Sequence, residues 1–417
     1  MTAQRTDGYR LPGLWPAEQG RERSVARWES ARREELVRSF AEHVYGHTPD
    51  GGALGDVTVH SRHYGALGGR AVRIEADLAL TGPRGVRTAS LLVYAPPAAG
   101  PDRPAPTLLG LNFGGNHAST TEPDVRIPAA AERIAAAHQG DGGAGGGGVG
   151  ARGAQARRWP YPLILERGFA VATLWYEEIE IDLPGFASAG VRGLFPAGDH
   201  AQWGAIGAWA WALSRALDAL RTIPELDASA VVVAGHSRLG KTALWAAAQD
   251  RRFAGVVSNE SGCGGASLFR HPGVEDIAVI TRARPHWFTP RFAGYRGAEH
   301  RLPVDQHQLI ALSAPRLTHV ASATRDAGAD PVGEFLATLH ASPIFELYGH
   351  RGTLPRGEFV PGAEVAPELA AAVAVPPPGT RIGGRLSYHL REGDHDMLAE
   401  DWTHILDAAD EHLPARR

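Results

Sequence analysis

Short apolar runs alternate with segments of helical periodicity in the second half of the chain, and this alternation constrains the fold more than any other feature. The runs have the length of buried strands and lie at 169–174, 230–234, 253–258, 317–321 and 386–390. The segments that predict helices lie at 203–221, 239–249, 333–340 and 400–413. Strands and helices in this alternation form a mostly parallel sheet with crossover helices on both faces. We therefore predict a three-layer α/β/α fold around a twisted sheet.

The first half of the chain predicts a helix followed by further strands. Residues 21–46 are rich in helix formers and predict an amphipathic helical segment within about 17–46. Strand-like runs, separated by glycine and proline, follow at 57–60, 71–80, 86–94 and 107–112. Glycine is so frequent at 139–155 that this segment predicts a flexible insertion. Because the alternation of strands and helices resumes after it, we expect one domain over 1–417.

The charge balance and the cysteine count exclude several classes of protein. The chain has 42 Lys and Arg residues against 46 Asp and Glu residues, a net charge of −4 with neutral histidines. This balance offers no basic field for nucleic acid or an anionic membrane, so we expect neither partner. The single cysteine, Cys263, can form neither an intrachain disulfide nor a multi-thiolate metal site. We expect a monomer whose fold depends on its hydrophobic core.

The N-terminal residues lack the apolar stretch of a secretory leader, which is roughly 7–15 residues long. Nowhere in the chain is there an uninterrupted apolar run of the about 18 residues that a membrane span needs. The sequence as written therefore predicts a cytoplasmic location. An extracellular location is the alternative, if a leader has been removed or export is unconventional.

The segment GHSRLGKT at 235–242 lies between a strand-like run and a helical run, and two chemistries fit it. As a P-loop, its backbone N–H groups would bind nucleotide phosphates. Lys241 would contact the phosphates as well, and Thr242 would bind magnesium. Glu260, just after the following strand, would then imitate a Walker B carboxylate. As a variant nucleophile elbow, the tight turn would lift Ser237 above the sheet, with Gly235 allowing the bend.

The rest of the chain favours the elbow. A serine nucleophile needs a base that takes its proton and a carboxylate that orients the base. In α/β-hydrolases these residues follow in the order serine, acid, histidine, each just past a later strand. His395 follows the last strand-like run, and two acids have suitable positions: Glu260 after the next strand and Asp326 beyond the run at 317–321. A P-loop, by contrast, usually opens the first βα unit of its domain.

Several segments resemble the glucuronoyl esterases, carbohydrate esterase family 15, and especially their bacterial members. They span nearly the whole chain and include RREE at 32–35, NFGGNH at 112–117, GHSRLGK at 235–241, SNESGCGG at 258–265, PHWF at 285–288, LPVDQH at 302–307 and DHDM at 394–397. The resemblance implies an α/β-hydrolase that acts without a metal or other cofactor. Its substrates would be esters between lignin alcohols and the carboxyl group of (4-O-methyl-)glucuronic acid on xylan, so the implied process is lignocellulose degradation.

The resemblance also implies roles for individual residues. Ser237 is similar to the nucleophile and His395 to the general base, while Glu260 and Asp326 match the two acid positions known in the family. Arg238 resembles the arginine that faces the oxyanion, where a fixed cation stabilises the developing charge. Four further residues are candidates for contact with the uronate substrate: Lys241, Glu275, Gln306 and Trp287.

One position departs from the family pattern and keeps alternatives open. Gly328 stands two residues after the second acid, where family members usually have tryptophan, so a wall of the sugar pocket is absent or supplied elsewhere. An acetyl or general carbohydrate esterase with the same triad is the first alternative, and a P-loop nucleotide-binding protein is the second. The third is a carbohydrate-binding protein of this fold with a disassembled triad.

Overall fold

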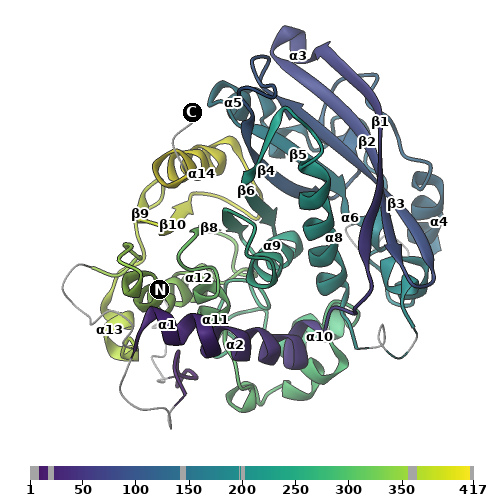
Figure 1. The fold of residues 1–417 in the computed structure, drawn as a ribbon. Coiled ribbons are helices and arrows are strands. Elements are labelled where there is room, and N and C mark those ends of the chain that lie inside the picture. Colours follow the sequence, from purple (N-terminus) through teal and green to yellow (C-terminus); the bar gives the residue numbers. More distant parts are fainter. Residues whose placement is uncertain are drawn as a thin grey trace.

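In the computed structural model, which describes residues 9–16, 23–140, 147–196, 198, 202–355 and 364–413, ten strands form one sheet (Figure 1). The spatial order of the strands is β1-β2-β3-β5-β4-β6-β7-β8-β10-β9. Their bounds are β1 Ala53–Gly65, β2 Ala71–Gly82, β3 Gly85–Ala95, β4 Ala105–Asn112, β5 Ala170–Trp175, β6 Leu226–His236, β7 Gly255–Asn259, β8 Leu317–Ala323, β9 Arg381–Gly383 and β10 Leu386–Arg391.

The central strands of the sheet are parallel and the flanking strands are antiparallel. Neighbours from β5 through β4, β6, β7 and β8 to β10 pair in parallel. Beyond β5 the sheet continues with β3, β2 and β1, each antiparallel to the strand beside it, and β9 closes the other edge as an antiparallel neighbour of β10. This architecture, with helices on both faces, confirms the predicted α/β-hydrolase type of fold.

Both faces of the sheet are buried because successive side chains of a strand point to opposite sides. On β4, Leu109 belongs to the core under one layer of helices and Leu108 to the core under the other. On β6, Val231 and Val233 share the first core, and Val232 lies in the second. This burial on both faces explains why the central strands read as continuous apolar runs rather than as alternating ones.

The helices divide between these two cores. The larger core packs the N-terminal helix, α8, α9, α11 and α12, and the smaller core packs α5 and α14. The N-terminal helix is continuous over α1 Val25–Arg27, two π-helical turns at Trp28–Arg32 and Ala41–Tyr45, and α2 Arg33–Phe40 between them. The other α-helices are α3 Ala66–Gly69, α4 Ala131–Gly140, α5 Tyr161–Glu166, α6 Tyr176–Ile179, α8 Ala205–Leu220, α9 Arg238–Gln249, α10 Ile277–Ala283, α11 Gln306–Ala311, α12 Pro331–Leu347, α13 Pro367–Ala372 and α14 Ala399–His412.

The glycine-rich segment differs from the expectation over part of its length. Helix α4 continues through residues 139 and 140, and residues 141–146 lie outside the described part of the chain. Beyond them the backbone packs on the loop that follows β4: Gly150 N donates to Gly114 O across 2.9 Å, and Gln155 N donates to Ala118 O across 2.9 Å. Glycine suits this packing because a Cβ at Gly150 would lie 2.9 Å from the Ala118 side chain.

Parallel pairing brings four chain segments to one edge of the sheet. The carboxyl ends of β6, β7, β8 and β10 are neighbours there, and each is followed by a loop. These loops carry Ser237, Glu260, Asp326 and His395, respectively. In the described part of the chain, no helix has the length and apolarity to cross a membrane.

Candidate active site

Ser237 occupies a strained turn between β6 and α9. Its backbone has φ 57° and ψ −129°, a conformation that a residue with a side chain rarely adopts. Ser237 N donates to Asn259 O across 2.8 Å, and Ser237 O accepts from Gly240 N across 2.9 Å. At Gly235 a Cβ would lie 2.0 Å from Leu239 O, so the sharp return of the chain requires glycine. This geometry is that of a nucleophile elbow.

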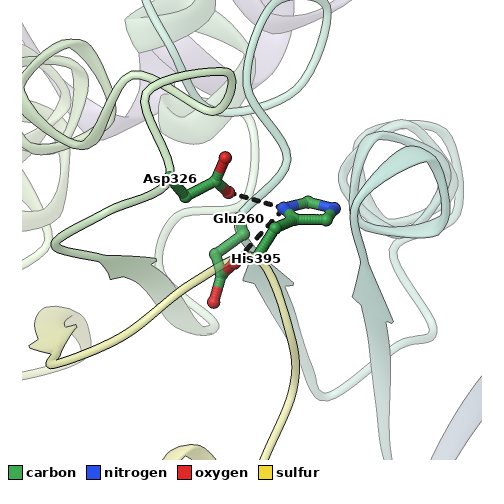
Figure 2. Close-up of side chains that lie close together, drawn as sticks. All are labelled: Glu260, Asp326 and His395. Atoms are coloured by element: carbon green, nitrogen blue, oxygen red, sulfur yellow. Dashed lines mark hydrogen bonds and ion pairs between the residues drawn. The ribbon is translucent and has the colours of Figure 1, made fainter.

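His395 lies beside the elbow, and one nitrogen of its ring contacts the carboxylates of both Asp326 and Glu260 (Figure 2). Its Nδ1 is 2.5 Å from Asp326 Oδ2 and 3.2 Å from Glu260 Oε2. In Figure 2 the other ring nitrogen points away from both acids. The His395 ring lies 4.4 Å from that of His236, the residue before the serine, and its side chain is 42% exposed. The imidazole is thus oriented by acids on one side and accessible on the other.

The electrostatics of the cluster favour a positively charged His395. Burial lowers the pKa of His395, but the hydrogen bonds to Asp326 and Glu260 outweigh it and raise this pKa to about 9. Burial raises the pKa of Glu260 to about 7. Burial acts in the same direction on Asp326, yet the hydrogen bond from His395 keeps the pKa of Asp326 below its usual value. Asp326 is therefore the more acidic of the two carboxyl groups.

Glu260 is fixed by donors on both of its oxygens. Arg391 Nη2 donates to Glu260 Oε1 across 2.8 Å, and Asp396 N donates to Glu260 Oε2 across 3.0 Å. Arg391 is buried, and it also donates to the carbonyl oxygens of Asp394 and Asp396 on either side of His395. Its Nε lies 3.0 Å from Oδ2 of the buried Asp401 on α14. One guanidinium thus holds both an acid and the histidine loop.

A metal ion is another group that this cluster could hold, because Glu260, Asp326 and His395 each offer one ligand atom. One ligand atom from each residue lies within 4.8 Å of the other two. The donor set, however, already has partners: His395 Nδ1 meets both acids, and Arg391 and the Asp396 amide occupy the Glu260 oxygens. A cation here would have to compete with a buried guanidinium. The chemistry of the set fits a base with two orienting acids better than a metal centre.

Arg238 directly follows Ser237 and begins helix α9. Its Nη1 pairs with Oδ2 of Asp182, a fully buried residue. Its guanidinium carbon lies 4.9 Å from the centre of the Trp287 ring and 5.6 Å from that of Phe113. In the neighbouring loop after β4, the Gly115 N–H donates to the Asn112 side chain across 2.9 Å. The Arg238 guanidinium is therefore confined by the rings of Trp287 and Phe113 and by the carboxylate of Asp182.

The residues expected to contact a uronate form a buried wall. Lys241 Nζ lies 2.7 Å from Cys263 O and 3.5 Å from Glu275 Oε1, and it lies 5.9 Å from the centre of the Trp287 ring. Glu275 is the more exposed partner, with 29% of its side chain accessible. Gln306 is fully buried, and its Nε2 donates to Gly265 O. The structure thus brings Lys241 close to both Glu275 and Trp287, whereas Gln306 bonds to the backbone of Gly265 and to the Tyr45 hydroxyl.

The P-loop alternative does not agree with this geometry. Lys241 Nζ donates to backbone carbonyl oxygens of the loop after β7, so it does not reach towards the mouth of the turn. Thr242 Oγ1 donates to Arg238 O across 2.9 Å within helix α9. A lysine and a threonine that serve a P-loop would instead face the phosphates and magnesium.

Gly328 lies open beside the acids. Among the described residues, the one atom beyond its chain neighbours within 4 Å of a Cβ built at this position is Asp326 Oδ1, at 3.5 Å. A side chain would therefore have space here.

Sequence reasoning missed two buried residues that support the site. Arg391 is the last residue of β10, and Asp182 follows α6 near the carboxyl end of β5. A position at the carboxyl edge of the sheet was the available signal for both. Their partners, however, lie 131 and 56 residues away in the sequence, so no local pattern pairs them.

Comparison with known proteins agrees with the geometry. A family model described as "Glucuronyl esterase, fungi" matches residues 170–349. A carbohydrate esterase from an unknown prokaryotic organism is 36% identical over 94% of this chain and 86% of its own length.

Two solved structures extend the similarity to the fold. The glucuronoyl esterase from Solibacter usitatus has a TM-score of 0.83 and 35% sequence identity, covering 98% of this chain and 99% of that one. A promiscuous esterase of carbohydrate esterase family 15 from a marine bacterial metagenome has a TM-score of 0.79 and 34% identity, covering 97% and 98% of the two chains.

Proposed function

Because the chain belongs to the glucuronoyl esterases of carbohydrate esterase family 15, we propose that it hydrolyses esters of (4-O-methyl-)glucuronic acid with Ser237 as the nucleophile. It is a carboxylic ester hydrolase of the serine type. The observation that carries the assignment of residues is the convergence of Asp326 and Glu260 on His395 Nδ1 beside the strained Ser237. The nucleotide-binding and general esterase alternatives gain no support from the family of the relatives.

In the first half of the reaction, Ser237 Oγ bonds to the ester carbonyl carbon while His395 Nε2 takes the hydroxyl proton. The carbonyl oxygen becomes an oxyanion, and Arg238 stabilises its charge. The intermediate then collapses as the bond to the alcohol oxygen breaks. His395 gives its proton to the departing alcohol, and the glucuronoyl group remains on Ser237 as an acyl-enzyme.

In the second half, water repeats these steps on the acyl-enzyme. His395 takes a proton from the water as its oxygen attacks the carbonyl carbon, and it then returns a proton to Ser237 Oγ. The products are the free uronate and the restored enzyme. The two carboxylates contribute in both halves because each proton transfer to His395 creates an imidazolium that they stabilise.

Neighbouring residues keep this proton transfer directed to His395. Burial and the positive charge of His395 lower the pKa of His236 well below its usual value, so His236 stays neutral beside it.

One side of the uronate subsite in this proposal is formed by Lys241, Glu275 and Trp287. Gln306 acts through Gly265 rather than by direct contact.

The test is the hydrolysis of benzyl glucuronate and of p-nitrophenyl acetate by the wild type, Ser237→Ala and a control, Ser229→Ala. Ser229 is exposed on β6 and donates through its N–H and its hydroxyl to Asp227, two residues earlier. We expect uronate-ester turnover that Ser229→Ala keeps and that Ser237→Ala lowers by about 10⁴-fold or more. Cleavage of the acetate without the uronate ester would contradict the substrate. Turnover retained in Ser237→Ala would contradict the nucleophile.

A further inference from the structure

Asp182 is a fully buried carboxylate at which four side chains meet. Its Oδ2 accepts from Arg238 Nη1 and, across 3.1 Å, from Tyr176 OH. Its Oδ1 lies 2.8 Å from His286 Nε2 and 2.6 Å from Trp287 Nε1. Its own backbone N–H donates to Glu177 Oε1, so the carboxylate is fixed from its backbone as well. The partners come from three separate stretches of the chain, at 176–177, 238 and 286–287.

We propose that Asp182 is a positioning residue that holds the Arg238 guanidinium where the oxyanion forms and ties this guanidinium to the Trp287 wall. The inference rests on the proposed function, in which Arg238 stabilises the oxyanion. Asp182 contacts no reacting atom in this proposal. It acts through Arg238, and through Trp287 it connects the oxyanion side of the site with the uronate subsite.

The charge of Asp182 is what makes it an effective anchor. Burial by itself would raise the pKa of Asp182, but the hydrogen bond from His286 and the charge of Arg238 outweigh burial and lower this pKa below its usual value. The group is therefore a carboxylate at neutral pH. A charge-assisted hydrogen bond to arginine is stronger and more directional than a neutral one.

Confinement of Arg238 matters because its side chain is long and has many rotamers. An unrestrained arginine would lose conformational entropy each time it met the transition state. Asp182 holds one end, and the rings of Trp287 and Phe113 flank the guanidinium. The Arg238 side chain is therefore already ordered before the substrate binds.

The experiment is a double-mutant cycle with Asp182→Asn and Arg238→Ala, measured as kcat and KM on benzyl glucuronate. Asp182→Asn keeps the size of the side chain and removes its charge. We expect kcat about 10- to 100-fold lower in Asp182→Asn and about 100-fold or more lower in Arg238→Ala. In the Arg238→Ala background we expect Asp182→Asn to have less than about a twofold effect on kcat, because its route to the oxyanion is gone.

Tyr176→Phe is the matched control, since it removes another donor to the same Asp182 oxygen and leaves Arg238 in contact. We expect this variant to keep kcat within about twofold of the wild type. If Tyr176→Phe lowers kcat as strongly as Asp182→Asn, Asp182 has a structural role only, and the proposal is wrong. The same cycle with Asp182→Glu, which keeps the charge but displaces it, provides the test if Asp182→Asn does not fold.

Two further results would separate this inference from the proposed function. An undiminished kcat in Asp182→Asn, or an equal loss with and without Arg238, would overturn the role of Asp182 and leave the esterase intact. An undiminished kcat in Arg238→Ala would remove the proposed oxyanion role of Arg238, and the inference would fail with it.

Discussion

Arg391 donates to Glu260 across 2.8 Å, and both side chains are buried beneath the loop of His395. This pair balances the charge of Glu260 within the protein. Asp326 instead meets His395 Nδ1 and accepts a hydrogen bond from the Ala329 N–H. The two acids that meet at His395 therefore differ in what they offer. In the proposed mechanism, Glu260 provides a fixed scaffold, and Asp326 provides the charge that balances the imidazolium.

This difference predicts unequal effects of removing the two charges. We expect Asp326→Asn to lower kcat about tenfold or more, and Glu260→Gln to lower it less, because Asp326 is closer to His395 Nδ1. The double variant should lose about 10³- to 10⁴-fold, as when an oriented histidine loses its acid altogether. Steady-state kinetics on benzyl glucuronate would measure this, with thermal unfolding to check each variant. A larger loss in Glu260→Gln would reverse the assignment.

The pH dependence should follow the raised pKa of His395. A general base acts in its neutral form, so kcat/KM should rise with pH as the imidazolium loses its proton. Because the two acids raise the pKa of His395 to about 9, the ascending limb should lie above the usual histidine value. Removing the carboxylate that accepts from His395 Nδ1 should lower this pKa, so Asp326→Asn should move the limb to lower pH. A pH profile of the wild type with a limb near 6.5 would contradict the expectation.

Arg391 should matter for stability as much as for activity. Arg391→Leu would remove the guanidinium that pairs with two buried carboxylates, Glu260 and Asp401. We expect a loss of about 3–5 kcal/mol in the free energy of unfolding, as for other broken buried pairs. Urea denaturation would measure it. The control is Arg325→Leu. Arg325 pairs at the exposed surface with Glu392 and Asp394, two acids of the loop that carries His395. Because exposed ion pairs contribute little, we expect little change in the free energy of unfolding for this variant.

Gly328→Trp should strengthen the uronate subsite. The backbone at Gly328 does not have positive φ, and a Cβ has space beside Asp326. A ring there could pack on the sugar, so we expect KM for benzyl glucuronate to fall about two- to tenfold with kcat nearly unchanged. Gly328→Ala, which adds no ring, should keep the wild-type KM. An unchanged or higher KM in Gly328→Trp would show that the open position serves something other than sugar contact.

The alternation of apolar runs and helical segments was sufficient to predict the fold class and the edge of the sheet where the site lies. Chain order alone then placed Ser237, Glu260, Asp326 and His395 after strands β6, β7, β8 and β10. Parallel strands bring their carboxyl ends to one edge, so this step needed no knowledge of distances. Both acids do lie near His395, as this reasoning predicted.

Tertiary structure alone decided which groups pair inside the site. The closer approach of Asp326, the clamp from Arg391 to Glu260, the bond from Asp182 to Arg238 and the burial of Gln306 have no local signature. Each joins residues from different strands and loops, and each depends on how far a loop extends and how a side chain turns once the sheet has formed. Periodicity and turn propensity act over a few neighbouring residues, whereas the pairing of buried charges is set by the whole path of the chain.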